Sequence, residues 1–101
     1  MTLEKIITLA NKAVQLRFTI MVRSLRATGC QLPVYVIPYD DHKFDLPENC
    51  FWLENEEIFS WLDSFNAFRA CRKYLCFLEE NYQFVDSDIV FLRNPAEVLE
   101  P

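Results

Sequence analysis

The triplet Asp86-Ser87-Asp88 is the part of the sequence best suited to chemistry. It follows an apolar run that ends in Phe84-Val85, and a second apolar run leads away from it over residues 89–92. Two short apolar runs with a charged step between them are typical of two buried strands. Because an unpaired buried carboxylate is costly, we expect both aspartates where a strand ends and a ligand begins.

Two aspartates at this spacing can share one hard cation. Carboxylate oxygens are the ligands that magnesium and manganese prefer, and a diphosphate beside such a cation brings further oxygens. The triplet therefore predicts a Mn2+ or Mg2+ site at Asp86 and Asp88, with Ser87 in the same binding loop. The alternative is that both acids only cap a turn.

Three earlier segments predict the elements that position this site. The β-rich run over residues 4–10 indicates a buried strand, the helical spacing over residues 12–28 indicates a helix that ends at Gly29, and residues 34–37 indicate a second strand. Strand, helix and strand form a parallel unit, and ligands of such sheets bind beyond the carboxyl ends of the strands.

Asn11 and Asp40 follow the first two of these strands, so both are candidate ligand contacts, with Asp41 beside Asp40. Turn chemistry is the alternative for all three, because Asn and Asp commonly bond to nearby backbone groups.

The second half of the chain predicts a third strand over residues 50–53 and two helices between Asn55 and Glu80, divided near residues 63–66. The second helix has a basic side, formed by Arg69, Arg72 and Lys73. Two interpretations of these cations are open: they face a ligand, or they are solvated or paired with nearby glutamates. Strands then lead into and away from the aspartate triplet. We expect the strand that contains Phe84 to lie beside the strand that contains Ile6, with Asn11, Asp40 and Asp86 near one edge of the sheet.

The string RKYLCFLEENYQFVDSDIVFLRNPAEVL, residues 72–99, resembles the GT-A type glycosyltransferases. In that family a basic helix precedes a strand, an Asp-x-Asp metal motif, a second strand and an Asn/Asp-Pro turn. The resemblance extends more faintly over residues 6–41. It implies an α/β fold, a Rossmann-like parallel-centred sheet flanked by helices, of which residues 1–101 are a single domain that is the nucleotide-sugar-binding half and is incomplete at its C-terminal end.

The resemblance also implies roles for residues. Asp88 coordinates the cation that bridges the donor diphosphate, Asp86 contacts the ribose or the metal through water, and Lys73 points toward the phosphates. Asn11 and Asp40 line the nucleoside pocket. The donor is a UDP- or GDP-linked sugar and the activity is hexosyl transfer, although the family's acceptor site, catalytic base and later metal ligand lie downstream of this motif. The partners to be expected are a second-half partner chain or further copies of this chain in a homo-oligomer.

Composition limits the other functions. The 101 residues are 51% hydrophobic, and the net charge of -5 argues against a nucleic-acid partner, because phosphate backbones are bound by an excess of Lys and Arg. No apolar run is long enough to span a membrane, so a cytoplasmic location is expected. The four cysteines lack CxxC spacing and are expected to be reduced packing residues.

Two other interpretations remain. The segment FVDSDIVFL is also similar to the first motif of haloacid dehalogenase type phosphatases, in which Asp86 would be the nucleophile and Asp88 the general acid. The third interpretation is a non-catalytic interaction domain.

Overall fold

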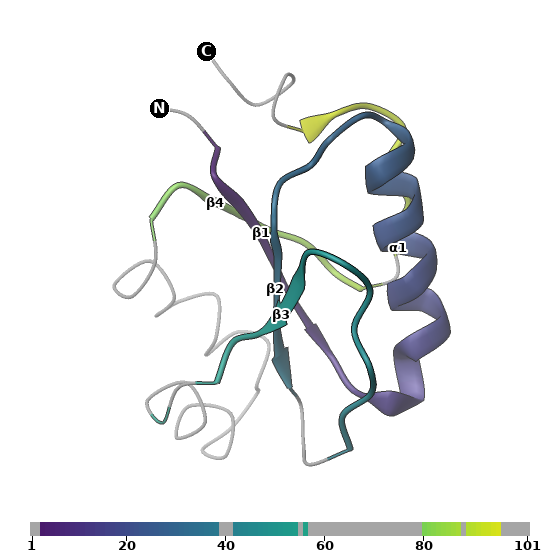
Figure 1. Ribbon diagram of the computed structural model, residues 1–101, viewed down its shortest axis with the longest axis vertical. Coiled ribbons are helices and arrows are strands. Elements are labelled where there is room, and N and C mark those ends of the chain that lie inside the picture. Colours follow the sequence, from purple (N-terminus) through teal and green to yellow (C-terminus); the bar gives the residue numbers. More distant parts are fainter. Residues whose placement is uncertain (1–2, 39–41, 55, 57–79, 88, 96–101) are drawn as a thin grey trace.

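The protein has an α/β fold in which one parallel sheet is covered on one face by a helix (Figure 1). The structure, a computed structural model, describes residues 3–38, 42–54, 56, 80–87 and 89–95. Within them the sheet contains β1 (Lys5–Ala10), β2 (Val34–Pro38), β3 (Cys50–Trp52) and β4 (Tyr82–Phe84), in the order β3-β2-β1-β4. All three pairs of neighbouring strands are parallel.

The central strand β1 is buried on both faces from Ile6 to Ala10, and Thr8 is the polar residue in that stretch. It pairs with β2 from Ile6↔Val34 to Ala10↔Pro38, and with β4 from Lys5↔Tyr82 to Ile7↔Phe84. A strand that is buried on both faces carries a continuous apolar run rather than an alternating one. The predictions of strands over residues 4–10, 34–37 and 50–53 are confirmed, and so is the parallel sheet.

The helix α1 (Gln15–Ala27) follows β1 through the 3-10 helix η1 (Lys12–Val14). Its buried side chains recur three and four residues apart, which places them on the face that meets the sheet: Phe18, Met21, Val22 and Leu25. They form one core cluster with Ile6, Ala10, Val34 and Val36. The helix predicted over residues 12–28 is thus confirmed, except that its first turn is a 3-10 turn.

The end of α1 is fixed by Gly29 and Arg26. Gly29 has a φ of +91°, the left-handed conformation that glycine adopts most easily after a helix. The half-buried guanidinium of Arg26 donates to the carbonyls of Cys30 (3.1 Å), Leu32 (2.6 Å) and Asn49 (3.3 Å). Arg26 therefore joins the end of α1 to the chain segments that enter β2 and β3.

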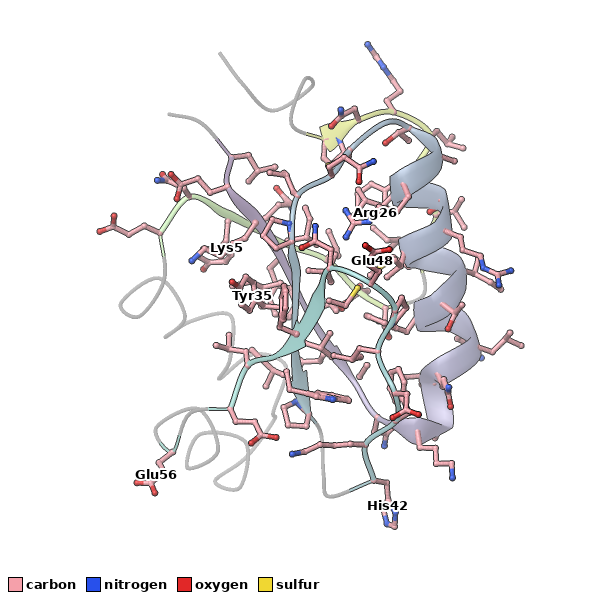
Figure 2. The ribbon with its side chains drawn as sticks, viewed as in Figure 1. Lys5, Arg26, Tyr35, His42, Glu48 and Glu56 are labelled. Carbon is pink, nitrogen blue, oxygen red and sulfur yellow. The ribbon has the colours of Figure 1, made fainter. Side chains whose placement is uncertain are left out.

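The other face of the sheet holds a second, smaller core of Ile7, Leu9 and Ile37, all of which are buried. Near this face the ammonium of Lys5 lies 5.8 Å from the centre of the Tyr35 ring (Figure 2). The two helices predicted between Asn55 and Glu80 fall almost entirely on residues 57–79, which lie outside the described residues.

The prediction of a further strand over residues 89–92 is wrong. The sheet of the described residues has four strands, and this segment is not among them. Ile89 and Phe91 pack against the core under α1, and the Phe91 N–H donates to the Ser24 hydroxyl at 2.8 Å. A short continuous apolar run is typical of a buried strand, but here Ile89 and Phe91 pack on the core while Val90 and Leu92 are exposed, which the run of four apolar residues did not indicate.

Candidate site at the carboxyl edge of the sheet

The carboxyl ends of β1 and β4 lie next to each other in the sheet. From β1 the chain builds β2 and then β3 on one side, and it returns to the other side of β1 to form β4. Such a reversal of strand order leaves a crevice beyond the strand ends, where parallel sheets commonly bind ligands. Asn11 directly follows β1, and Asp86 follows β4 by two residues, so both candidate residues belong to this edge.

Asn11 acts as the cap of the 3-10 helix. Its side-chain carbonyl accepts a hydrogen bond from the N–H of Ala13 at 3.1 Å, and its backbone carbonyl accepts one from the N–H of Val14 at 3.1 Å. The turn chemistry considered from the sequence is therefore present at Asn11. The side chain is half-buried, so a cap and a contact to a ligand are compatible at this position.

The loop after β2 is joined to the start of the first helical turn. The N–H of Lys12 donates to the carbonyl of His42 at 2.7 Å, and Pro38 pairs with Ala10 at the last position of the ladder. Asp40 lies outside the described residues. Its described neighbours in the chain, Pro38 and His42, both lie beside the end of β1.

Asp86 sits in the turn that follows β4. The N–H of Val85 donates to the Ile7 carbonyl at 3.0 Å, which extends the pairing with β1 by one bond, and the N–H of Ile89 donates to the Asp86 carbonyl at 3.4 Å. The Asp86 side chain is exposed and Ser87 is half-buried. In the described part of the chain, this turn is closed by the backbone of Asp86 and not by its carboxylate.

Asp88 and Lys73 lie outside the described residues, so Asp86 is the described carboxylate of the triplet. Among the described residues there is no group of three or more His, Cys, Asp or Glu side chains that could hold a metal. A metal that is bound together with a diphosphate needs few protein ligands, because the phosphates and water fill the other positions. An exposed carboxylate at a strand end has the oxygen chemistry that Mn2+ and Mg2+ prefer.

Thr8 is a polar residue of this region that the sequence analysis did not single out. It is fully buried in β1, and its hydroxyl has no hydrogen-bond partner among the residues that the structure describes. Because side chains alternate along a strand, Thr8 lies on the α1 face with Ile6 and Ala10. Its signal in the sequence is a lone hydroxyl inside an apolar strand, two residues before that strand ends.

The carboxyl edge of the sheet also has an ion pair between Lys43 and Glu54. Glu54 lies two residues after the end of β3. The Lys43 ammonium lies 6.0 Å from the centre of the Trp52 ring, at the last residue of β3. Phe44, next in the chain, packs edge-on against both Phe18 and Trp52. The loop after β2 is thus held against both α1 and β3.

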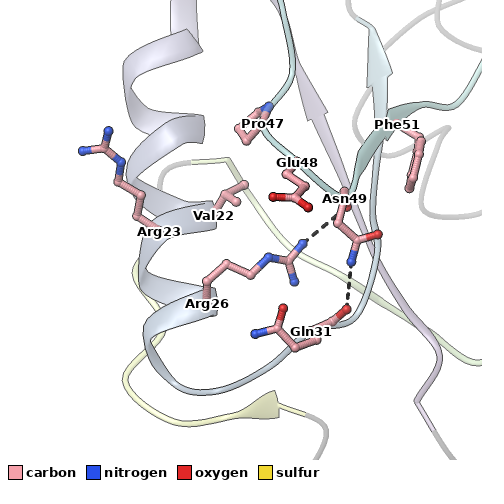
Figure 3. Close-up of a pocket in the computed structure, with 8 residues that line it drawn as sticks. All are labelled: Val22, Arg23, Arg26, Gln31, Pro47, Glu48, Asn49 and Phe51. Atoms are coloured by element: carbon pink, nitrogen blue, oxygen red, sulfur yellow. Dashed lines mark hydrogen bonds between the residues drawn. The ribbon is translucent and has the colours of Figure 1, made fainter.

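A hollow of about 650 Å³ lies at the opposite edge of the sheet, where β2 and β3 begin (Figure 3). Its polar wall is made of groups that hold the loops: Arg26 binds the Asn49 carbonyl, and the Asn49 amide donates to the Gln31 carbonyl at 2.8 Å. Figure 2 shows Arg26 and His42 near opposite ends of α1. The hollow contains none of the predicted site residues.

Cys50 is the first residue of β3, close to this hollow. Burial raises the pKa of its thiol, while the positive charge and a hydrogen bond of Arg26 lower it in part. Cys50 and Cys30 are both buried free thiols, as predicted, and Cys71 and Cys76 lie outside the described residues.

No family model, no curated protein and no solved structure matches this chain. Among the described helices, none has the length and apolar character required to cross a membrane.

Proposed function

We propose that this chain binds the nucleotide-sugar donor of a GT-A type glycosyl transfer, a UDP- or GDP-linked sugar held with Mn2+ or Mg2+ at the carboxyl edge of the sheet. The observation that carries the proposal is the position of Asn11 and Asp86. They follow neighbouring parallel strands at the point where the strand order reverses, which is the common ligand position in such sheets.

The strand order adds support. The order β3-β2-β1-β4 is the order in which the first strands of a doubly wound nucleotide-binding sheet are arranged. In that arrangement the residues after β1 and β4 face one crevice. The acidic triplet follows β4 and no other strand, so the motif and the topology agree on the same crevice.

The residues then have distinct tasks. Asp86 and Asp88 would hold the cation, whose chemistry is to stabilise the negative charge that develops on the leaving diphosphate. Ser87 lies between them in the binding loop. Asn11 and Asp40 would line the nucleoside pocket, and Lys73 would place a positive charge near the phosphates. The proposal is restricted to donor binding, because the acceptor side of such enzymes lies downstream of the motif.

Calorimetric titration with UDP and GDP, in manganese and in chelator, tests the proposal. We expect weak binding that depends on the metal. Asp88→Asn should reduce the affinity roughly ten- to a hundredfold, because a charge-assisted contact is worth about 1.5–3 kcal/mol. Glu4→Gln is the matched control, since Glu4 is an exposed carboxylate at the amino end of β1.

Three outcomes separate the interpretations. Metal-dependent nucleotide binding that Asp88→Asn weakens and Glu4→Gln leaves intact supports the donor site. Binding of phosphate or its fluoride analogues with magnesium, with Asp86→Asn the more damaging change, favours the phosphatase. If the folded protein binds neither nucleotide nor phosphate at millimolar concentration, the interpretation as a non-catalytic interaction domain is the one that remains.

A further inference from the structure

The outer face of α1 exposes two large aliphatic side chains. Leu16 is 74% exposed and Ile20 is 46% exposed, while α1 forms the outer border of the described molecule (Figure 1). Residues three or four apart on a helix are neighbours on its surface. Lys12, Leu16, Ile20 and Arg23 therefore form one line, named here the α1 stripe, with a cation at each end and aliphatic side chains in the middle.

The stripe borders a shallow hollow on the helix surface. The hollow has a volume of about 440 Å³ and is lined by all four residues of the stripe, together with Gln15 and Thr19. A further exposed cation, Arg17, follows Leu16 in the chain. No hydrogen bond or ion pair is recorded for the side chains of Lys12, Arg17 or Arg23 within the described part of the chain.

The charged residues of η1 and α1 have one sign, while Glu48, from the loop before β3, lines the hollow of Figure 3 together with Arg23. From Lys5 to Tyr39 the sequence contains no Asp or Glu, although the whole chain has a net charge of -5. The acids are therefore concentrated elsewhere in the sequence. A basic helix face on an acidic protein gives the molecule a preferred orientation toward any negatively charged surface.

A second copy of α1 does not fit the stripe. If two stripes paired in parallel, Lys12 would face Lys12 and Arg23 would face Arg23. If they paired antiparallel, each Lys12 would face an Arg23. Both arrangements set cation against cation at both ends, so the occupant must itself be negatively charged and must also accept Leu16 and Ile20.

We propose that the α1 stripe docks the protein on the surface of a bilayer that contains anionic lipids. A bilayer supplies negative charge at both ends of the stripe and an apolar layer between them. The long stems of Lys12 and Arg23 reach the phosphates, while Leu16 and Ile20 enter the boundary between headgroups and acyl chains. Contacts of this kind are reversible, because a few cations and two aliphatic side chains provide modest affinity.

The test is flotation of the full chain with vesicles of phosphatidylcholine containing about one-third phosphatidylserine, and with vesicles of phosphatidylcholine alone. We expect binding to the first kind only, and its loss in about 0.5 M NaCl. Arg17→Gln with Arg23→Gln should weaken it on the order of fivefold for each cation removed. Arg93→Gln, which removes an exposed cation that is not part of the α1 stripe, is the charge control.

The aliphatic half of the stripe has its own pair of variants. Leu16→Gln should weaken vesicle binding, whereas Leu92→Gln, which replaces a leucine that is 88% exposed and is not part of the α1 stripe, should not. Equal binding to both kinds of vesicle, no binding by a protein that circular dichroism shows to be folded, or equal effects of Arg93→Gln and the paired arginine variant would overturn the proposal. Binding to soluble poly-glutamate but not to vesicles would also overturn it, and would assign the stripe to an acidic polypeptide.

Discussion

Arg26 contributes to stability through a single guanidinium that serves three carbonyl groups. Its hydrogen bonds reach the carbonyls of Cys30, Leu32 and Asn49, of which the Asn49 carbonyl also accepts a hydrogen bond from the N–H of Val34 at 3.1 Å. We expect Arg26→Met to lower the free energy of unfolding by about 2–4 kcal/mol, because hydrogen bonds to charged groups are worth roughly 1.5–3 kcal/mol and this site is only partly buried. Urea denaturation measures the change.

The neighbouring Arg23 provides the control for this prediction. Arg23 is exposed and one turn away on α1, so Arg23→Met should change stability by less than about 0.5 kcal/mol. Arg26→Lys should fall between the two, since lysine keeps the charge but lacks the fork that reaches several carbonyls. Equal stabilities of Arg26→Met and Arg23→Met would contradict the role assigned to Arg26.

Cys50 should make the free energy of unfolding depend on pH in the alkaline range. Burial raises the pKa of its thiol in the folded protein, so above the unfolded value of about 8.5 the unfolded chain loses the proton while the folded chain keeps it. The unfolded state then binds fewer protons, and the free energy of unfolding falls as pH rises. The stabilisation is fully present below the unfolded pKa.

The comparison with Cys50→Ala isolates this effect. The variant should be less stable at neutral pH, because a buried side chain is shortened. Its stability should nevertheless fall less steeply between about pH 8 and pH 10 than that of the unchanged protein. Parallel stability curves for the two proteins, measured by denaturation at each pH, would show that Cys50 is not the group responsible.

At the scale of elements, the junction of β1 and α1 depends on Asn11. Asn11→Ala removes the acceptor of the Ala13 N–H and should lower stability by about 1 kcal/mol, within the range of about 0.5–2 kcal/mol for lost caps. Asn11→Ser keeps a capping oxygen and should restore most of that stability. Thermal denaturation of the two variants measures the cap alone.

The same two variants separate the cap from the proposed ligand contact. If Asn11 also contacts the nucleoside, Asn11→Ser should bind UDP or GDP more weakly although its stability is near that of the unchanged protein. A serine variant with unchanged stability and unchanged affinity would leave Asn11 with its capping role only.

The sequence predicted the elements whose pattern is local. The β-rich runs gave β1 and β2, the helical spacing of Phe18 and Leu25 gave α1, and Gly29 gave its end. Side-by-side placement of the first strand and the strand before Asp86 was also predicted and is confirmed. For the candidate site, the pairing of β1 with β4 is what places Asn11 and Asp86 at the same edge of the sheet.

The features that the sequence did not predict depend on tertiary contacts. Arg26 has the same residue type as the solvated Arg23, and only the folded loops show that its guanidinium has three carbonyl partners. Residues 89–92 are a short apolar run of the kind that forms buried strands, but the N–H of Phe91 donates to the hydroxyl of Ser24 on α1, which is far away in the sequence. Thr8 was not distinguished because its environment depends on what packs on β1.

For the whole molecule, the two proposed surfaces meet at one corner. The α1 stripe begins at Lys12, which directly follows Asn11, and the Lys12 N–H binds the loop after β2. Docking through the stripe would therefore bring the carboxyl edge of the sheet close to the bilayer. The two proposals stay independent in their tests, because the stripe variants Arg17→Gln and Leu16→Gln change no predicted site residue.

The last prediction concerns the stability of the whole molecule when a donor nucleotide binds. Asn11 and Asp86 follow two different strands of the same sheet, so a ligand that contacts both should bind the folded state alone. At a tenfold excess of free nucleotide over its Kd, such binding adds about 1.4 kcal/mol to the free energy of unfolding. For a domain of this size that corresponds to a rise in Tm of about 6–11 °C. The rise should require manganese, be absent in chelator, and be reduced in Asp88→Asn but kept in Glu4→Gln. A rise in Tm that is the same in chelator, or the same in Asp88→Asn, would mean that the nucleotide binds somewhere other than the acidic triplet.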